Sequence, residues 1–357
     1  MIPIRNSRQR CSIERYDNNV FFSLVCYRNN LFTSNDPEKI IEFYNGFEDR
    51  DQLIQWMKER PKGASYIHEV NGDKDIVVVI PTADFGGKYA KTCREKLFKG
   101  LHMIFVESGE NPDSYFNYAH NCNVGIKKAI EYNPKWVVVS NDDMNKIDEV
   151  KKLIERLKEV SPKDYDILFP NTGVYHTLSL YIGKKRTIYN LYKLITDRFL
   201  YVSYKRFKID FFYAFHNWKS KVVFKKIYNS NFICTVALGI FSSKYLERNG
   251  KSFFDEIYIN EHEDLDISFR LHLIKAKCKQ INYSIDALRG STLTNGRPRE
   301  LRAITGRTYF NWKYSKLFQY MIESGKNYGK IRINPYNDKL IEIAWNSKQG
   351  DGKNEIH

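Results

Sequence analysis

Short apolar runs that alternate with helical segments between residues 75 and 169 constrain this fold more than any other feature. Four of these runs predict strands, at 76–80, 102–106, 136–139 and 165–169. The segments between them predict helices, at 86–99, within 114–131 and at 148–159. Continuous apolar strands are typical of a sheet that is covered on both faces, and strands that alternate with helices indicate a parallel sheet. We therefore expect an α/β protein with a mostly parallel central sheet flanked by helices.

Turns and changes of composition divide the chain into three parts. Residues 1–72 are expected to form a small N-terminal α/β module, with a strand at 20–27, helices at 37–44 and 49–60, and a short strand at 64–70. An Asn-Gly-Asp turn follows this module, and such turns commonly separate elements. The main domain is expected to span 73–310, and residues 311–357 are expected to form a C-terminal helix and tail.

One internal segment differs from the rest in charge. Residues 183–230 hold 12 Lys and Arg against two Asp, in a chain whose net charge is +15. Aromatic residues recur there at helical spacing, as in Phe211, Phe215 and Trp218, so the insert at 177–230 is predicted to form basic amphipathic helices. Such helices suit the anionic surface of a membrane or a lipid phosphate. They equally suit a helical subdomain that buries its aromatic side chains and leaves its lysines in water.

The remaining composition bears on location and on partners. The six cysteines are scattered with no CxxC pair, which is typical of the reduced thiols of an intracellular protein. No run of about 18 apolar residues occurs, so a transmembrane helix is not expected. We expect a cytoplasmic protein that can lie peripherally on the cytoplasmic face of a membrane through residues 183–230. The basic charge favours acidic partners, but no nucleic-acid motif is present, so nucleic acid is not the expected partner.

Polar residues follow three of the predicted strands at the point where each strand ends. They are residues 81–84 (Pro-Thr-Ala-Asp), 107–109 (Glu-Ser-Gly) and 140–143 (Ser-Asn-Asp-Asp). Ligands of parallel α/β sheets bind at the carboxyl ends of the strands. Carboxylates such as Asp142 and Asp143 are hard oxygen ligands for Mg²⁺ or Mn²⁺. Asn and Asp after a strand are equally typical of a plain turn.

An acidic helix start at 263–270 (EDLDISFR) is the second place where chemistry is expected. The positive end of the helix dipole favours carboxylates there, and a carboxylate held in that position can act as a general base towards a hydroxyl group. Asp266 and Arg270 lie four residues apart on one helix face, so they are expected to brace the helix. A solvated helix start whose acids only match the dipole would have the same composition.

Five segments together resemble the inverting glycosyltransferases of family 2, which have the nucleotide-sugar-binding fold called GT-A. The segments are DIVVVIPTADFG, HMIFVESGENPD, NCNVGIKKAIE, WVVVSNDDM and ALGIFSSKYLERNGKSFFDEIYINEHEDLDISFRL. They are similar, in order, to the first strand with its base-binding turn, the strand ending in VVDDGSxD, the helix segment ARNxGixxA, the strand ending in a DxD-type motif, and the region of the acidic ED pair. Several motifs in the right order are more specific than any one of them. The resemblance covers about residues 75–295 without the insert and implies a Rossmann-like GT-A domain.

The resemblance also implies a function and roles for individual residues. The function would be transfer of a sugar, with inversion, from a nucleotide-diphosphate sugar to a hydroxyl of a lipid-linked, polymeric glycan or protein acceptor. Asp264 corresponds to the family's catalytic base, and Glu263 is the next candidate. Asp143 corresponds to the last residue of the DxD motif and Asn141 to the first, which implies a site for Mg²⁺ or Mn²⁺. The nucleotide sugar would contact a larger set of residues: Pro81, Thr82, Ala83, Asp84, Glu107, Asn123, Asp142 and Arg289.

Three features leave alternatives open. Arg289 stands where the family often has a metal-binding His; since an arginine binds phosphate but not a cation, metal dependence is left open. The basic loop at 295–299 is expected to be a mobile lid over the donor. The run Gly86-Gly87-Lys88 allows a nucleotidyltransferase with a similar nucleotide-binding half. A non-catalytic module that binds membrane or nucleic acid is a further alternative.

Overall fold

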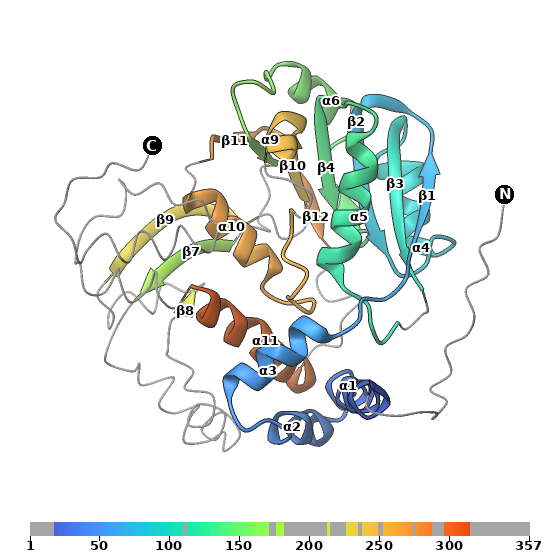
Figure 1. Cartoon of the computed structure of the whole chain (residues 1–357). Helices are drawn as coiled ribbons and strands as arrows, with labels where there is room; N and C mark the ends of the chain where they lie inside the picture. Colours follow the sequence, from blue (N-terminus) through green and yellow to red (C-terminus); the bar gives the residue numbers. More distant parts are fainter. Residues whose placement is uncertain are drawn as a thin grey trace.

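The computed structural model has a seven-stranded sheet at its centre (Figure 1). Its strands are β1 (Ser65–Val70), β2 (Asp73–Thr82), β3 (Leu101–Ser108), β4 (Trp136–Ser140), β6 (Ile167–Pro170), β10 (Leu238–Ser242) and β11 (Cys278–Ile281). The residues that the structure describes are 18–109, 113–170, 176–181, 213–214, 226–234, 238–248, 253–273, 276–287 and 296–314.

The strands follow the order β1-β3-β2-β4-β10-β6-β11 across the sheet. Strand β2 is parallel to both β3 and β4, and β6 is parallel to β11. Strand β1 is antiparallel to β3, and β10 is antiparallel to β4 and β6. The expected α/β class with a mostly parallel central sheet is therefore confirmed. Because β2, β3 and β4 are parallel neighbours, their carboxyl ends meet at one edge of the sheet.

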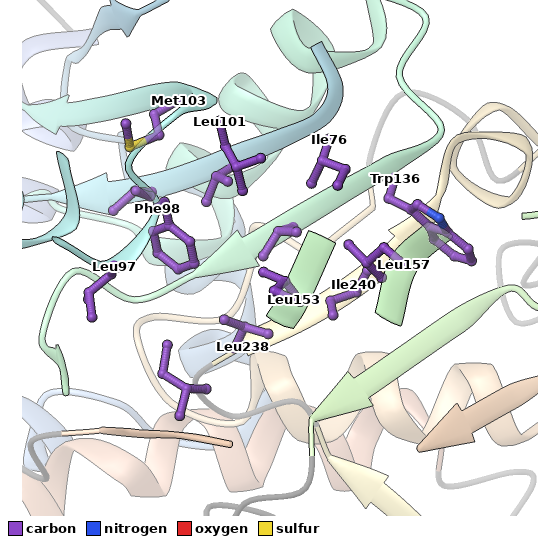
Figure 2. Close-up of a cluster of buried hydrophobic side chains, with 14 of the residues drawn as sticks. Ile76, Leu97, Phe98, Leu101, Met103, Trp136, Leu153, Leu157, Leu238 and Ile240 are labelled. Carbon is purple, nitrogen blue, oxygen red and sulfur yellow. The ribbon is translucent and has the colours of Figure 1, made fainter. Parts of the chain in front are cut away.

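Helices cover both faces of the sheet, as the continuous apolar strands predict. On one face, side chains such as Ile76 and Val78 of β2 pack with Leu97 of the π-helix η1 (Cys93–Leu97) and with Leu153 of α6 (Val150–Lys158) (Figure 2). On the other face, Val77 and its neighbours pack with α5 (Tyr118–Ile130) and α9 (Ser243–Arg248). A short helix, α4 (Lys88–Thr92), leads directly into η1.

Five helices form a second core beside the sheet. Helices α1 (Asn18–Phe32), α2 (Pro37–Asn45) and α3 (Arg50–Glu59) pack with α10 (Glu263–Leu273) and α11 (Arg297–Lys313) (Figure 1). Helices α2 and α3 begin where the sequence predicts, since Asp36 and Asp49 cap them through side-chain bonds to backbone N–H groups. The hydroxyl of Tyr44 donates to the carbonyl oxygen of Leu301 at 2.6 Å and so joins α2 to α11.

The leading segment differs from the expected α/β module. The strand predicted at 20–27 is wrong, because these residues lie inside helix α1. Val25 of this run packs in a core formed with other helices instead of lying in a sheet. The short strand predicted at 64–70 is present as β1, but it is hydrogen-bonded to β3 at the edge of the central sheet. Residues 18–70 therefore share one core and one sheet with the segments that follow.

The insert also differs from expectation wherever the structure describes it. Strands β7 (His176–Tyr181), β8 (Tyr213–Ala214) and β9 (Lys226–Cys234) form a three-stranded antiparallel sheet in the order β8-β7-β9, which lies beside α10 (Figure 1). Basic amphipathic helices are thus wrong for these three stretches of 177–230. The rest of the insert, residues 182–212 and 215–225, lies outside the described residues.

Two smaller observations complete the fold. The helix and strand predicted from the acidic run are present as α10 and β11, and β12 (Ile285–Ala287) pairs with β5 (Met144–Lys146). The expected lid at 295–299 is wrong for Arg297–Arg299, which form the first turn of α11. A proline favours such a first turn, and Pro298 occupies it. Among the described residues, no helix combines the length and the apolar character that a membrane span needs.

Candidate active site at the strand ends and the start of α10

The carboxyl ends of β2 and β4 are joined by a side-chain hydrogen bond. Thr82, the last residue of β2, donates from Oγ1 to Oδ2 of Asp142 at 2.7 Å. Asp84 lies exposed two residues further on, and its backbone N–H points towards the same hydroxyl at 3.4 Å. Three residues predicted from the sequence, Thr82, Asp84 and Asp142, are therefore brought together at the expected edge of the sheet.

Acidic side chains gather at the end of β4. Asp143 is buried. Burial raises the pKa of Asp142 to about 6. The hydrogen bond from Thr82 opposes this rise, and the charge of Asp143 adds to it. The thiol of Cys93 donates to the carbonyl oxygen of Asp142 at 3.3 Å, and its pKa is raised by burial and by both carboxylates. A raised carboxyl pKa means that a second negative charge is unfavourable here without a compensating positive charge.

These residues offer part of a cation site. Asp142, Asp143 and Asn141 present the carboxylate and amide oxygens that Mg²⁺ and Mn²⁺ prefer. Within the described part of the chain, no three His, Cys, Asp or Glu side chains are grouped in a way that could hold a metal ion. The donor set therefore suits a cation that takes its remaining ligands from a bound diphosphate and from water.

Glu107, at the end of β3, is already engaged by protein groups. Its Oε1 accepts from the backbone N–H of Phe85 at 2.9 Å, and its Oε2 lies 2.7 Å from Nε2 of His68. The His68 ring stacks on Phe85 at 4.3 Å between centroids, while the guanidinium of Arg94 covers the ring at 4.2 Å. Glu107 thus fixes the loop after β2. His68, Phe85 and Arg94 were missed because they come from three different elements.

Several other predicted contacts have a different place in the structure. Asn123 is buried, and its amide donates to Phe254 O and to Glu256 at 2.8 Å each, while its carbonyl oxygen accepts from the backbone. It therefore holds the segment 253–256. Pro81 is buried within β2, and Ala83 is partly exposed just after it. Arg289 lies outside the described residues.

The glycines of a nucleotidyltransferase-like loop are packed against an acid. A Cβ added at Gly87 would lie 2.9 Å from Oδ2 of Asp84, and one added at Gly86 would lie 3.3 Å from Oδ1. The carboxylate of Asp84 therefore occupies the position beside these backbone groups. A negative charge there repels phosphate, which argues against a phosphate loop in this turn.

Glu263 and Asp264, the two candidates for the catalytic base, lie at the start of α10. Glu263 is buried, and its Oε2 has no hydrogen-bond partner among the described residues. Burial, followed by the charges of Asp264 and Glu261, raises the pKa of Glu263 well above its ordinary value. Asp264 is partly exposed, and its Oδ1 accepts from the backbone N–H of Leu265 at 2.7 Å. Of the two carboxyl groups, Glu263 is therefore the one whose charged form is penalised by burial, whereas Asp264 reaches the surface in part.

The brace expected behind this pair is present and is larger than the sequence indicates. Arg270 donates from Nε to Oδ2 of Asp266 at 2.7 Å, and both side chains are buried. Lys313 of α11 lies 2.8 Å from the other oxygen of Asp266 and 2.7 Å from Oδ2 of Asp255. Burial opposes the charge on Asp266, but Lys313 and Arg270 outweigh it and lower the pKa of this carboxyl.

One residue that the sequence did not indicate connects the two acidic groups. Tyr118 donates from its hydroxyl to Oδ1 of Asn141 at 2.9 Å. Burial raises its pKa well above the ordinary value, and neighbouring Cys122, Glu263 and Asp264 raise it further. Tyr118 therefore bonds the strand-end amide of Asn141 and lies near enough to the α10 acids for their charges to affect its pKa.

Comparison with known proteins adds no family to this geometry. A scan against protein-family models gives no match. A search of curated proteins also finds no significant match. The functional interpretation therefore rests on the residues and on their arrangement.

Proposed function

We propose that this chain is an inverting glycosyltransferase with a GT-A fold that uses a nucleotide-diphosphate sugar as donor. The observation that carries the proposal is the convergence on Tyr118 of the β4 end, through Asn141, and of the α10 start, through Glu263 and Asp264. Sugar transfer needs both charge neutralisation at the departing diphosphate and a base at the acceptor hydroxyl. The two acidic groups fit these two needs.

Asp264 is the proposed base. The acceptor hydroxyl gives its proton to the Asp264 carboxylate while its oxygen forms a bond to the anomeric carbon. The bond between that carbon and the diphosphate oxygen breaks, and the nucleoside diphosphate leaves with the electron pair. One such displacement inverts the configuration. Asp264 lies partly exposed in the first turn of α10, where the positive end of the helix dipole favours a carboxylate, which suits it for this role.

Asp143, Asn141 and Asp142 would hold Mg²⁺ or Mn²⁺. The bound cation would neutralise negative charge on the diphosphate. The raised pKa of Asp142 supports a cation at this position, since a positive charge would relieve the unfavourable pair of carboxylates. Thr82 orients Asp142 through its hydrogen bond, and Asp84 and Glu107 shape the loop that would face the nucleoside.

The acceptor classes follow from charge and position. The insert at 183–230 carries 12 of the chain's Lys and Arg residues, and strands β7 and β9 of the insert lie beside the base helix α10. A segment of this charge suits a lipid-phosphate acceptor or peripheral contact with an anionic membrane. A polymeric glycan or a protein acceptor remains within the same proposal.

A donor screen with three variants tests the function. We expect one nucleotide sugar to raise the melting temperature, and Mn²⁺ to increase that rise. Asp264→Asn should lower transfer by about 10²–10⁴-fold and keep donor binding, since only the proton acceptor is removed. Asp143→Asn should lose the Mn²⁺-dependent part of donor binding. Asp75→Asn is the matched control, because Asp75 is exposed and pairs with Lys135.

Two results would contradict the proposal. Normal turnover by Asp264→Asn would remove the base assignment. If the parent protein is not stabilised by any nucleotide sugar and consumes none, with or without Mn²⁺, the glycosyltransferase function is wrong.

A further inference from the structure

Tyr118 is attached to the segment before α10 through its backbone. Its N–H donates to Oδ1 of Asn260 at 2.8 Å, and the amide of Asn260 donates back to the carbonyl oxygen of Phe116 at 3.1 Å. Asn260 has a φ of 56°, in the left-handed region that asparagine tolerates better than most residues. This reciprocal pair clamps the start of α5 to the turn at Asn260.

The same turn sets the position of the proposed base. Two residues after Asn260, His262 also has a positive φ, of 74°, and its carbonyl oxygen accepts from Asp266 N at 2.9 Å as α10 begins. Glu263 and Asp264 follow directly. Only three residues therefore separate the clamped Asn260 from Asp264, and the hydrogen bond from Asp266 to His262 restrains the chain around Asp264.

The side chain of Tyr118 extends to the other half of the site. Its hydroxyl donates to Oδ1 of Asn141, and the amide group of Asn141 therefore has a fixed orientation at the end of β4. A carbonyl oxygen has two lone pairs, so Oδ1 can accept this bond and still ligate a cation. The neighbouring Asn117 strengthens the arrangement, because it caps α5 and donates to the carbonyl oxygens of Glu256 and Tyr258 at 2.9 Å.

We propose that Tyr118 is a positioning residue that fixes the proposed base Asp264 relative to the cation-binding end of β4. This inference rests on the proposed function. Tyr118 itself takes no proton and touches no reacting atom. Its backbone holds the turn before α10, its hydroxyl holds Asn141, and the rigid ring keeps the two anchors at a constant separation. A misplacement of about 1 Å between reacting groups can cost about 10²-fold in rate.

Two variants separate the two anchors. Tyr118→Phe removes the hydroxyl but keeps the ring and the backbone bond to Asn260. Asn260→Gly removes the side-chain acceptor, and glycine keeps the positive φ without strain. Tyr132→Phe is the matched control, because it also removes a tyrosine hydroxyl that bonds a polar side chain, here Glu69 on another part of the molecule.

The variants are compared in full-length protein by three measurements. The first is the Kd for Mn²⁺ in the absence of donor, measured by electron paramagnetic resonance of the free ion. The second is kcat, and the third is the KM for the donor. For Tyr118→Phe we expect kcat to fall about 10–100-fold and the Kd for Mn²⁺ to rise by about threefold to tenfold, while the donor KM changes by less than about threefold. For Asn260→Gly we expect a similar fall in kcat with an unchanged Kd for Mn²⁺. Tyr132→Phe should match the parent in all three.

The outcomes distinguish the inference from the function on which it rests. If the parent transfers sugar and both variants keep its kcat, the positioning role is wrong while the glycosyltransferase function stands. A fall in kcat that appears equally in Tyr132→Phe would be a general loss of packing and would also overturn the role. If the parent consumes no nucleotide sugar, both the function and the inference are wrong.

Discussion

Lys313 holds helix α10 through the most heavily charged buried contact that the described residues show. Replacement of Lys313 therefore gives a quantitative test of the fold. Its ammonium bridges Asp266 of α10 at 2.8 Å and Asp255 of the preceding segment at 2.7 Å. Asp266 is fully buried, and the side chain of Lys313 is only 12% exposed. We therefore predict that Lys313→Met destabilises the protein strongly, since methionine fills a similar volume without the charge.

The magnitude follows from what the substitution leaves behind. Two acids would then face one remaining cation, Arg270, and removal of one partner from a buried ion pair costs about 3–5 kcal/mol. The rings of three tyrosines lie 5.5–5.9 Å from the ammonium, near the outer limit for a cation–π contact, so their loss adds little. At about 2.1 cal/mol/K per residue, 357 residues have an unfolding entropy of about 0.75 kcal/mol/K. The expected fall in Tm is therefore about 4–7 °C.

Thermal unfolding followed by near-ultraviolet circular dichroism measures this fall. Lys58→Met is the control, because the Lys58 ammonium lies 4.5 Å from the Trp312 ring at an exposed position with no buried carboxylate beside it. We expect the control to lose less than about 1 kcal/mol. If Lys313→Met loses no more than Lys58→Met, the network does not hold α10, and the reasoning about the brace fails.

Two further predictions concern stability. The hydrogen bond with His120 lowers the pKa of Glu256 to about 2, although burial opposes this shift. The Glu256 carboxylate therefore stabilises the fold above its unfolded pKa near 4.5, and this stabilisation is lost as the pH falls towards 2. Glu256→Gln should therefore lower the free energy of unfolding by about 1–2 kcal/mol at pH 7, after allowance for partial exposure. The difference in urea midpoint between the variant and the parent should shrink below pH 4.5, and a constant difference would contradict this prediction. Gly125→Ala should lose about 1–3 kcal/mol in the same urea assay, because its Cβ would lie 2.3 Å from Val79 Cγ1 and 3.0 Å from Val106 Cγ2; parental stability would show that α5 can move away from the sheet.

The strand–helix alternation predicted the central sheet well because buried parallel strands have a local signature. The leading helix was missed because an apolar run of eight residues fits a strand and a buried helix equally. Among the residues of α1 whose burial is described, Val25, Asn29 and Phe32 are buried, and their spacing of four and three is helical. A longer window would have favoured the helix. The start of α11 was missed although Pro298 gives the same kind of signal that identified α2.

The candidate site could be predicted only in part, for a similar reason. Asp142, Asp143, Glu263 and Asp264 follow from local patterns, namely a strand end and a helix start. Tyr118 has no local pattern, because its partners lie 23 and 142 residues away along the chain. Contacts of that kind depend on how the elements pack, and a single sequence does not contain that information directly.

The helical core shared by α1–α3, α10 and α11 has a consequence for the order of synthesis. The bond from Tyr44 to Leu301 spans 257 residues, which take about 13–50 s to synthesise at about 5–20 residues per second. During that time the apolar faces of α2 and α3 lack the part of their core that α10 and α11 supply. Because α10 belongs to this core, a product truncated before α11 would carry the strand-end acids without a correctly placed base. Under the proposed function, premature termination would therefore abolish transfer of the sugar.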